Sequence, residues 1–208
     1  MRPRPFALAL AAASLVLYHL FWRQSILTRG ATDLEARSRL PGDDLLEDAD
    51  GVATRAIAIH APASAVWPWL VQMGPSPRGG ADTYDWIENL LGLNMHSVDS
   101  VLSEFQHPEV GDTIGYGSNR MRLELVEPRR ALGWRAEDGN WTCTFVLEER
   151  DGTTRLISRN RLRLPTLIAR IAMLPMVPGS LVMERKMLLG IKERAEKLAT
   201  SGPEHDEL

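Results

Sequence analysis

Cysteine is almost absent from this sequence, and so are the short motifs of several common catalytic chemistries. Cys143 is the only cysteine among 208 residues, which excludes an intrachain disulfide and a cluster of thiolate metal ligands. Cys143 alternates with Trp141 and Phe145, a pattern typical of a small core residue in a strand rather than of a nucleophile. There is no HExxH, GxSxG, GxxxxGKS/T or CxxC motif, so zinc-protease, hydrolase, phosphate-loop and dithiol chemistries are not indicated.

An excess of charge of either sign is also missing. The chain has 24 basic and 27 acidic residues and a net charge of −3, which gives no reason to expect a nucleic-acid partner. Three histidines are scattered without metal-ligand spacing, namely His60, His96 and His107, and we expect neither a metal site nor a cofactor. The hydrophobic share of 44% is that of an ordinary globular chain.

A strongly hydrophobic run without formal charge lies at the front. Phe6 to Trp22 spans 17 residues without a formal charge, between arginines at positions 2, 4, 23 and 29. A helix of this length reaches roughly 25 Å, slightly short of the ~30 Å hydrocarbon core. A cleaved signal peptide is the alternative, but bulky Phe21 and Trp22 stand where small residues should mark cleavage. We predict that residues 1–22 are an uncleaved single-pass membrane anchor.

Acidic residues dominate the next segment. Between positions 33 and 50 there are seven acidic and two basic residues, with Pro41 and Gly42 among them. Such a composition is typical of a solvated linker or of a chain wrapped on the surface. We therefore assign residues 23–50 to an acidic juxtamembrane linker.

From Val52 onward the patterns predict an α+β domain. VATRAIAIH alternates like a strand, and APASAVWPWLVQMG reads as a short helix that Pro68 bends. The runs MRLELV, ALGWRA, WTCTFVLEE and RLISRNRLRL follow, with Asp-Gly pairs at 138–139 and 151–152, which indicates an antiparallel meander. The final run, VPGSLVMERKMLLGIKERAEKLAT, has helical apolar spacing and should pack on the sheet.

This order of elements resembles the helix-grip fold of the START-like, or SRPBCC, superfamily. TRAIAIHAPASAVWPWLVQMG resembles the first strand and helix of bacterial SRPBCC-type proteins, and YDWIENLLGLNMHS and MERKMLLGIKERAE resemble segments of a membrane-anchored subgroup. The superfamily includes polyketide cyclase/dehydrase and lipid-transport proteins. The resemblance covers residues 51–200 and implies a curved antiparallel sheet around a long C-terminal helix, with a cavity between them. Residues 201–208 are expected to be a disordered acidic tail.

The strand RLISRNRLRL carries polar residues on both faces. Ser158 and Asn160 share a face with three leucines. If that face is buried, the two side chains either bond each other, water or a neighbouring strand, or form a polar spot that orients a ligand. The opposite face carries the arginines 155, 159, 161 and 163, and we expect it to be solvated or to lie against anionic headgroups.

The segment TYDWIENLLGLNMHS, residues 83–97, is a short helix with several readings. Asp82 or Thr83 suits its N-cap, Gly92 suits its C-cap, and Trp86 and Leu90 share a packing face. The segment could have a purely structural role, could form the lip of a pocket, or could supply general acid/base groups, and the sequence leaves these three alternatives open. The weak catalytic candidates are Asp85, Glu88 and His96.

These observations lead us to expect a membrane-anchored protein that binds a hydrophobic small molecule or lipid. The expected ligand-binding residues are Trp67, Tyr84, Trp134, Phe145, Ser158 and Asn160. A cyclase- or dehydratase-type enzyme on the same fold is the first alternative, and a ligand-free interaction or structural module is the second. The chain ends in HDEL and has a sequon at Asn140. The bacterial character of the resemblance nevertheless favours a bacterial cell membrane over the endoplasmic-reticulum lumen.

Overall fold

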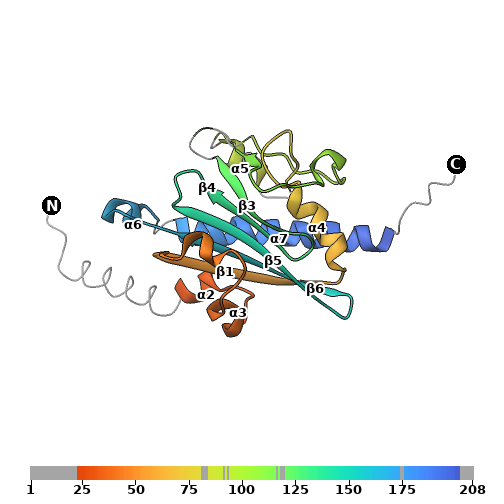
Figure 1. Cartoon of the computed structure of the whole chain (residues 1–208), viewed down its shortest axis with the longest axis horizontal. Coiled ribbons are helices and arrows are strands. Elements are labelled where there is room, and N and C mark those ends of the chain that lie inside the picture. Colours follow the sequence, from red (N-terminus) through yellow and green to blue (C-terminus); the bar gives the residue numbers. More distant parts are fainter. Residues whose placement is uncertain are drawn as a thin grey trace, which may run out of the picture.

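The fold is one antiparallel sheet with a long helix on one face and a short helical segment on the other (Figure 1). The computed structural model describes residues 23–80, 84–90, 92, 94–115, 117, 120–173 and 176–201. The six strands, in the spatial order β1-β6-β5-β4-β3-β2, are β1 Gly51–Ile59, β2 Thr113–Ile114, β3 Met121–Glu127, β4 Ala131–Ala136, β5 Trp141–Arg150 and β6 Thr153–Leu162. The helices are α2 Arg23–Leu27, α3 Asp33–Arg37, α4 Ala63–Val71, α5 Asp85–Leu90, α6 Leu167–Met173 and α7 Met176–Ser201, with 3-10 turns η2 Asp43–Leu46 and η3 Ser103–Phe105.

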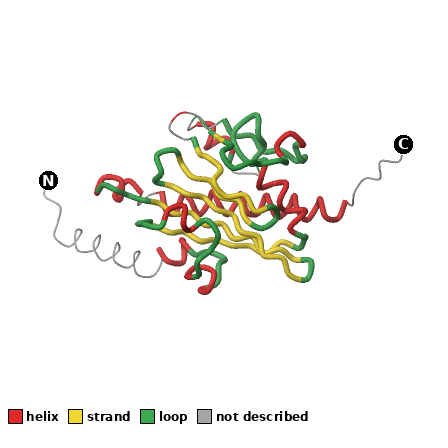
Figure 2. The backbone as a smooth tube through the Cα atoms, viewed as in Figure 1, coloured by secondary structure: helices red, strands yellow, loops and turns green. Residues whose placement is uncertain are grey.

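The curved sheet and the long C-terminal helix agree with the predicted α+β helix-grip architecture. Helix α7 runs along the sheet and contacts β1 and α4 (Figures 1 and 2). The four predicted strand runs of the meander are β3 to β6. Strand β2, with two residues, is a small edge strand that the sequence patterns did not indicate.

The predicted anchor, residues 1–22, lies outside the described residues. Within the ranges that the structure describes, no single helix is long and apolar enough to cross a membrane. Helices α6 and α7 taken together pass the same test of length and composition as a bent pair.

Strand pairing decides which side chains share a face of the sheet. Arg55 of β1 lies opposite Ser158 of β6, which lies opposite Phe145 of β5. This row faces α7, as the contact of Arg55 with Glu184 of α7 shows. Thr54, Arg159 and Thr144 form the next row, and because successive side chains of a strand alternate, this row faces the opposite side.

The main hydrophobic core lies between the sheet, α4 and α7. Its largest members from the sheet are Leu123, Trp134, Phe145 and Leu156, and α7 contributes Leu188, Ile191 and Ala195. The three α7 residues recur at helical spacing, which confirms the predicted apolar stripe. Helix α4 begins after Pro62 and contains Pro68, as the sequence indicated.

The outer face of the sheet is covered by residues 30–50, and the expectation of a solvated arginine face is wrong. Arg159 is only 3% exposed. Its Nη1 donates to a carboxylate oxygen of Asp43 at 2.7 Å and to the carbonyl of Ser38 at 2.8 Å, and its Nε donates to the hydroxyl of Thr54 at 3.0 Å. A buried charge requires such partners, so the acidic segment supplies what the arginines need.

Two more arginines of β6 extend this attachment. Arg161 donates to the carbonyls of Leu46 and Glu47 and pairs with Asp43 at 3.3 Å. Arg155 makes a two-point contact with Glu35, at 2.7 and 2.9 Å. The segment that was predicted to be either a linker or a surface wrap is therefore a layer bound to the sheet through arginine–carboxylate pairs.

Breaking the pair between Asp43 and Arg159 should detach this layer. We expect Asp43→Ala to lower the free energy of unfolding by about 3 to 5 kcal/mol, because it leaves the Arg159 charge buried without a carboxylate. Urea unfolding measures the loss, and limited proteolysis should show faster cleavage within residues 28–50. Arg150→Ala is the control, since Arg150 is exposed and pairs only with its exposed neighbour Asp151. Equal stability of Asp43→Ala and Arg150→Ala would contradict the proposed attachment.

Glu35 should make stability depend on acid pH. Its hydrogen bonds to Arg155 lower the pKa of this carboxyl from 4.5 to about 2, against the opposing effect of burial. A carboxyl with a lowered folded-state pKa stabilises the fold above its unfolded pKa, and this contribution is lost as the pH falls from 4.5 through 2. In Glu35→Gln we expect a loss of about 1 kcal/mol at neutral pH and a smaller decline of unfolding free energy below pH 4.5. Parallel acid profiles of the two proteins would argue against this.

Candidate functional site

A polar cluster is buried on the inner face of the sheet, where β1 and β6 meet the first half of α7. Arg55 is 1% exposed, and its Nη1 donates to Oε2 of Glu184. Its Nη2 donates to Ser180 at 3.1 Å, and its Nε donates to the carbonyl of Ile26 in α2 at 3.3 Å. Asn160 donates from Nδ2 to the same Glu184 oxygen at 3.4 Å.

The helix brings these groups together because Ser180, Glu184 and Leu188 are four residues apart and share one side of α7. The side of α7 that faces the sheet is thus polar at Ser180 and Glu184 and apolar from Leu188 onward. The cluster marks the boundary between a polar and an apolar half of the interior. Sequence reasoning found Ser158 and Asn160 but missed Arg55 and Glu184. Arg55 on an otherwise apolar strand and Glu184 within a helical stripe were the available signals.

The environment raises the pKa of Glu184. Burial is the largest cause, and the positive charge of Arg55 opposes it. Interaction with the Ser158 hydroxyl also lowers this pKa, yet Ser158 Oγ and Glu184 Oε1 are both buried atoms without a hydrogen bond of ordinary geometry. Burial likewise raises the pKa of Cys143, so this thiol stays protonated and is a core side chain rather than a nucleophile.

Two buried oxygens that lack partners give the cluster a capacity for one more polar contact. A buried hydroxyl or carboxyl oxygen without a hydrogen bond costs roughly 1 to 3 kcal/mol, which a donor group from a bound molecule would recover. A neutral Glu184 could also donate a proton. The cluster can therefore bind a polar group at the edge of an apolar region.

Four of the six predicted ligand-binding residues lie on this inner face. Asn160 and Trp134 flank Cys143 in one row, and Ser158 and Phe145 are paired in the next. Trp67 of α4 belongs to the same hydrophobic core as Trp134 and Phe145. Tyr84 is half-buried and precedes α5, apart from these strands. Trp67, Trp134, Phe145 and Ser158 are all buried against neighbouring protein.

A cation that the sequence did not indicate covers part of this core. The guanidinium of Arg78 lies 5.9 Å from the ring centre of Trp134 and 4.7 Å from that of Phe105. It also donates to the carbonyl of Val71 at 2.8 Å. Burial lowers the pKa of Arg78. Cation–π contacts of this kind hold the loop after α4 against the end of the core.

Two of the three weak catalytic candidates, Asp85 and His96, make contacts or lie exposed away from the buried cluster. Asp85 accepts hydrogen bonds from the backbone N–H and the hydroxyl of Ser97, at 2.7 and 2.9 Å, which ties α5 to the loop that follows it. His96 is exposed, and the Glu88 side chain lies outside the described residues. The expected packing face of this helix is wrong, because Trp86 and Leu90 are 70% and 80% exposed. A catalytic role for the three stays a prediction.

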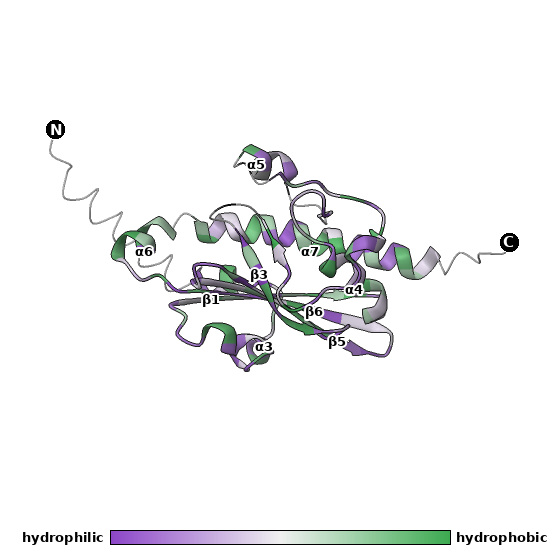
Figure 3. Ribbon diagram, turned by 45° about the horizontal axis from the view of Figure 1, so that its top comes forward, coloured by the Kyte–Doolittle hydropathy of each residue, from purple (hydrophilic) through white to green (hydrophobic). Residues whose placement is uncertain are grey.

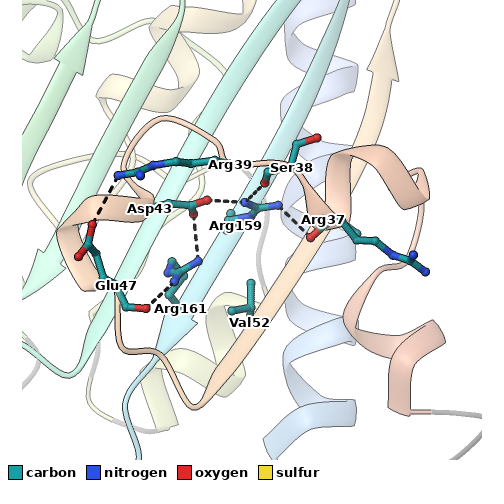
Figure 4. Close-up of a pocket in the computed structure, with 9 residues that line it drawn as sticks. Arg37, Ser38, Arg39, Asp43, Glu47, Val52, Arg159 and Arg161 are labelled. Carbon is teal, nitrogen blue, oxygen red and sulfur yellow. Dashed lines mark hydrogen bonds and ion pairs between the residues drawn. The ribbon is translucent and has the colours of Figure 1, made fainter.

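A pocket of about 380 Å³ opens on the outer face, between β6 and the covering layer (Figure 4). Its lining includes Arg37, Arg39, Asp43, Arg159 and Arg161. The deep arginines already donate to Asp43 and to backbone carbonyls, so their donors are not available to an anion. The pocket is therefore a weaker candidate than the inner cluster. Over the residues that the structure describes, no group of three or more His, Cys, Asp or Glu side chains is placed to hold a metal ion.

Comparison with known proteins finds solved structures that align with most of the chain at low sequence identity and with TM-scores below 0.5. No family model and no curated protein matches the sequence. Among solved structures, the Polyketide_cyc-like protein Cgl2372 from Corynebacterium glutamicum has 18% identity and a TM-score of 0.37, covering 76% of this chain and 96% of its own. KanY protein has 11% identity and a TM-score of 0.49, with coverage of 70% and 97%. CalU16 from Micromonospora echinospora has 16% identity and a TM-score of 0.34, with coverage of 72% and 86%.

Of these three, Cgl2372 is named as a Polyketide_cyc-like protein. Assignment to a membrane-anchored subgroup stays a prediction.

Removing Arg55 should reveal the cost of burying Glu184. We expect Arg55→Met to lower the free energy of unfolding by about 3 to 5 kcal/mol at neutral pH. Because the pKa of Glu184 is raised in the folded state, protonation of this group stabilises the fold at low pH, and the gain is lost as the pH rises through the raised pKa. Urea unfolding of Arg55→Met at several pH values should show that the free energy of unfolding falls as the pH rises. Adding Glu184→Gln to Arg55→Met should abolish this pH dependence. A pH profile that Glu184→Gln leaves unchanged would contradict the assignment.

Proposed function

We propose that the protein binds a hydrophobic small molecule or lipid between the sheet and α7, with a polar group of that molecule at the Arg55–Glu184 cluster. The observation that carries this proposal is a pair of buried oxygens, Ser158 Oγ and Glu184 Oε1, that make no hydrogen bond of ordinary geometry and lie beside an apolar core. We propose further that residues 6–22 anchor the protein in a membrane, which would place the site near a source of apolar molecules.

The chemistry of the cluster narrows the ligand class. The two oxygens accept hydrogen bonds, and the guanidinium of Arg55 is already bound to Glu184, Ser180 and the Ile26 carbonyl. A hydroxyl or amide N–H group on the ligand would therefore be recognised better than a second carboxylate. The apolar body of the ligand would lie along Phe145 and Trp134. Because these side chains are packed when no ligand is present, binding requires that α7 or the loop after α4 move away from the sheet.

An enzyme of the cyclase or dehydratase type is the second candidate, and one observation favours it. General acid catalysis needs a carboxyl that keeps its proton close to neutral pH, and the pKa of Glu184 is raised by burial. In that case Glu184, rather than Asp85, Glu88 or His96, would donate the proton. The ligand-free module is the third candidate and is an outcome of the test below.

Native mass spectrometry of the full-length protein, purified from its own host in nanodiscs, tests the binding proposal. We expect a bound mass that is released on unfolding and that organic extraction identifies. Repeated absence of a bound mass would favour the ligand-free module.

A matched pair of variants tests whether the inner face holds the ligand. We expect Ser158→Ala to weaken binding of the extracted ligand about tenfold, because one hydrogen bond of roughly 1.4 kcal/mol is lost. The control is Thr142→Val, which removes another buried hydroxyl without a partner but from the outer face, where Thr142 lies beside Arg161. Titration by fluorescence or calorimetry measures both. Equal weakening in the two variants would place the ligand elsewhere.

A further inference from the structure

Helix α6 exposes its apolar residues instead of packing them against the protein. Leu167, Ile168 and Ile171 are 72%, 80% and 58% exposed, and Met176 at the start of α7 is 58% exposed. We call these four residues the α6 corner. Single exposed apolar residues are common on soluble proteins, but a contiguous group marks an interaction surface. Figure 3 shows α6 as a hydrophobic element at one end of the molecule.

Arg170, the one charged residue of α6, contacts the protein although its side chain is 58% exposed. Arg170 donates from Nη2 to Asp50 at 2.8 Å and from Nε to the carbonyl of Leu164 at 3.2 Å. None of the residues of α6 is buried. A helix of a soluble protein normally buries its apolar side and exposes its charged one, so the outward side of α6 is suited to an apolar environment.

Arginines border the α6 corner, and aspartates pair with them. Arg170 of α6 pairs with Asp50 at 2.8 Å, and Arg163 pairs with Asp48 at 3.6 Å. The charge beside the corner is therefore balanced. The two arginine side chains are 58% and 39% exposed and can reach the polar headgroups of a bilayer while the apolar residues enter it.

The position of α6 agrees with a membrane on this side. Helix α2 contacts α7 and β1, and it lies at the same end of the molecule as α6 (Figure 1). The chain enters α2 at Arg23, directly after the uncharged run of residues 6–22. A bilayer that holds this run would therefore lie near the α6 corner.

Helix α7 shows that the corner would lie on the bilayer rather than cross it. Leu188, Ile191 and Ala195 of α7 are buried in the core, so α7 cannot leave the sheet to span a membrane without unfolding that core. A short apolar helix flanked by arginines is typical of insertion into the interface only.

We propose that the α6 corner docks into the interfacial layer of a lipid bilayer, as a second membrane contact besides residues 6–22. The inference extends the proposed membrane anchoring and does not depend on a ligand. A second copy of the chain and residues 6–22 themselves are the competing occupants of the corner.

Site-specific quenching in nanodiscs that contain phosphatidylglycerol tests the proposal on the full chain. The environment-sensitive fluorophore NBD is attached to Ile168→Cys, or to the control Arg150→Cys in the exposed β5–β6 hairpin, each in a Cys143→Ala background. We expect lipids with a nitroxide on the acyl chain to quench the label at position 168 severalfold more than the label at position 150. Quenching that is weak and equal at both positions overturns the proposal.

Two further arms separate the alternatives. A label at Ser14→Cys reports on the proposed anchor, so quenching at position 14 without quenching at position 168 overturns docking of α6 and leaves the anchor standing. A label at position 168 that is shielded from water but not quenched by lipid also overturns docking. In that case, shielding that increases with protein concentration identifies a second copy as the occupant. Shielding that does not change with protein concentration identifies residues 6–22 as the occupant.

Discussion

A buried charge must have a partner, and this constraint holds both outer layers onto the sheet. Strand β1 carries Arg55 on the inner face and β6 carries its arginines on the outer face, and each buried arginine meets a carboxylate from another element. Arg159 pairs with Asp43 of the covering segment, and Arg55 pairs with Glu184 of α7. Without these acids the arginines would have to remain in water, and neither the covering segment nor the first half of α7 could lie where it does.

The same constraint produces the candidate site. Apolar side chains at positions 55 and 184 would have extended the hydrophobic core toward the N-terminus of α7. The ion pair instead ends the core there and leaves Ser158 and Asn160 beside it, so a polar spot borders the aromatic region of Trp134 and Phe145. A ligand with one polar end and an apolar body fits this boundary because each of its parts would meet matching chemistry.

The two ends of α7 differ in the exposure of their apolar side chains. Toward its C-terminus the helix packs on the sheet through Leu188, Ile191 and Ala195, while at its N-terminus Met176 and the preceding α6 turn apolar side chains outward. The proposed membrane contact and the polar cluster therefore lie at the same half of the helix. Movement of this half at a bilayer would open the interior on the side from which an apolar molecule arrives.

Local periodicity was sufficient to predict the strands, the long helix and the alternation of β6, since each depends on residues close in sequence. The sequence alone thus determined that Ser158 and Asn160 share one face and the β6 arginines the other. It could not determine what covers each face, because Asp43 is 116 residues from Arg159 and Glu184 is 129 residues from Arg55. Only the tertiary structure decided that the acidic segment is a layer bound to the sheet and that Trp86 and Leu90 are exposed. It also decided that the Arg55–Glu184 pair is buried on the inner face. The physical reason is that pairing of buried charges is a long-range condition, which no local pattern records.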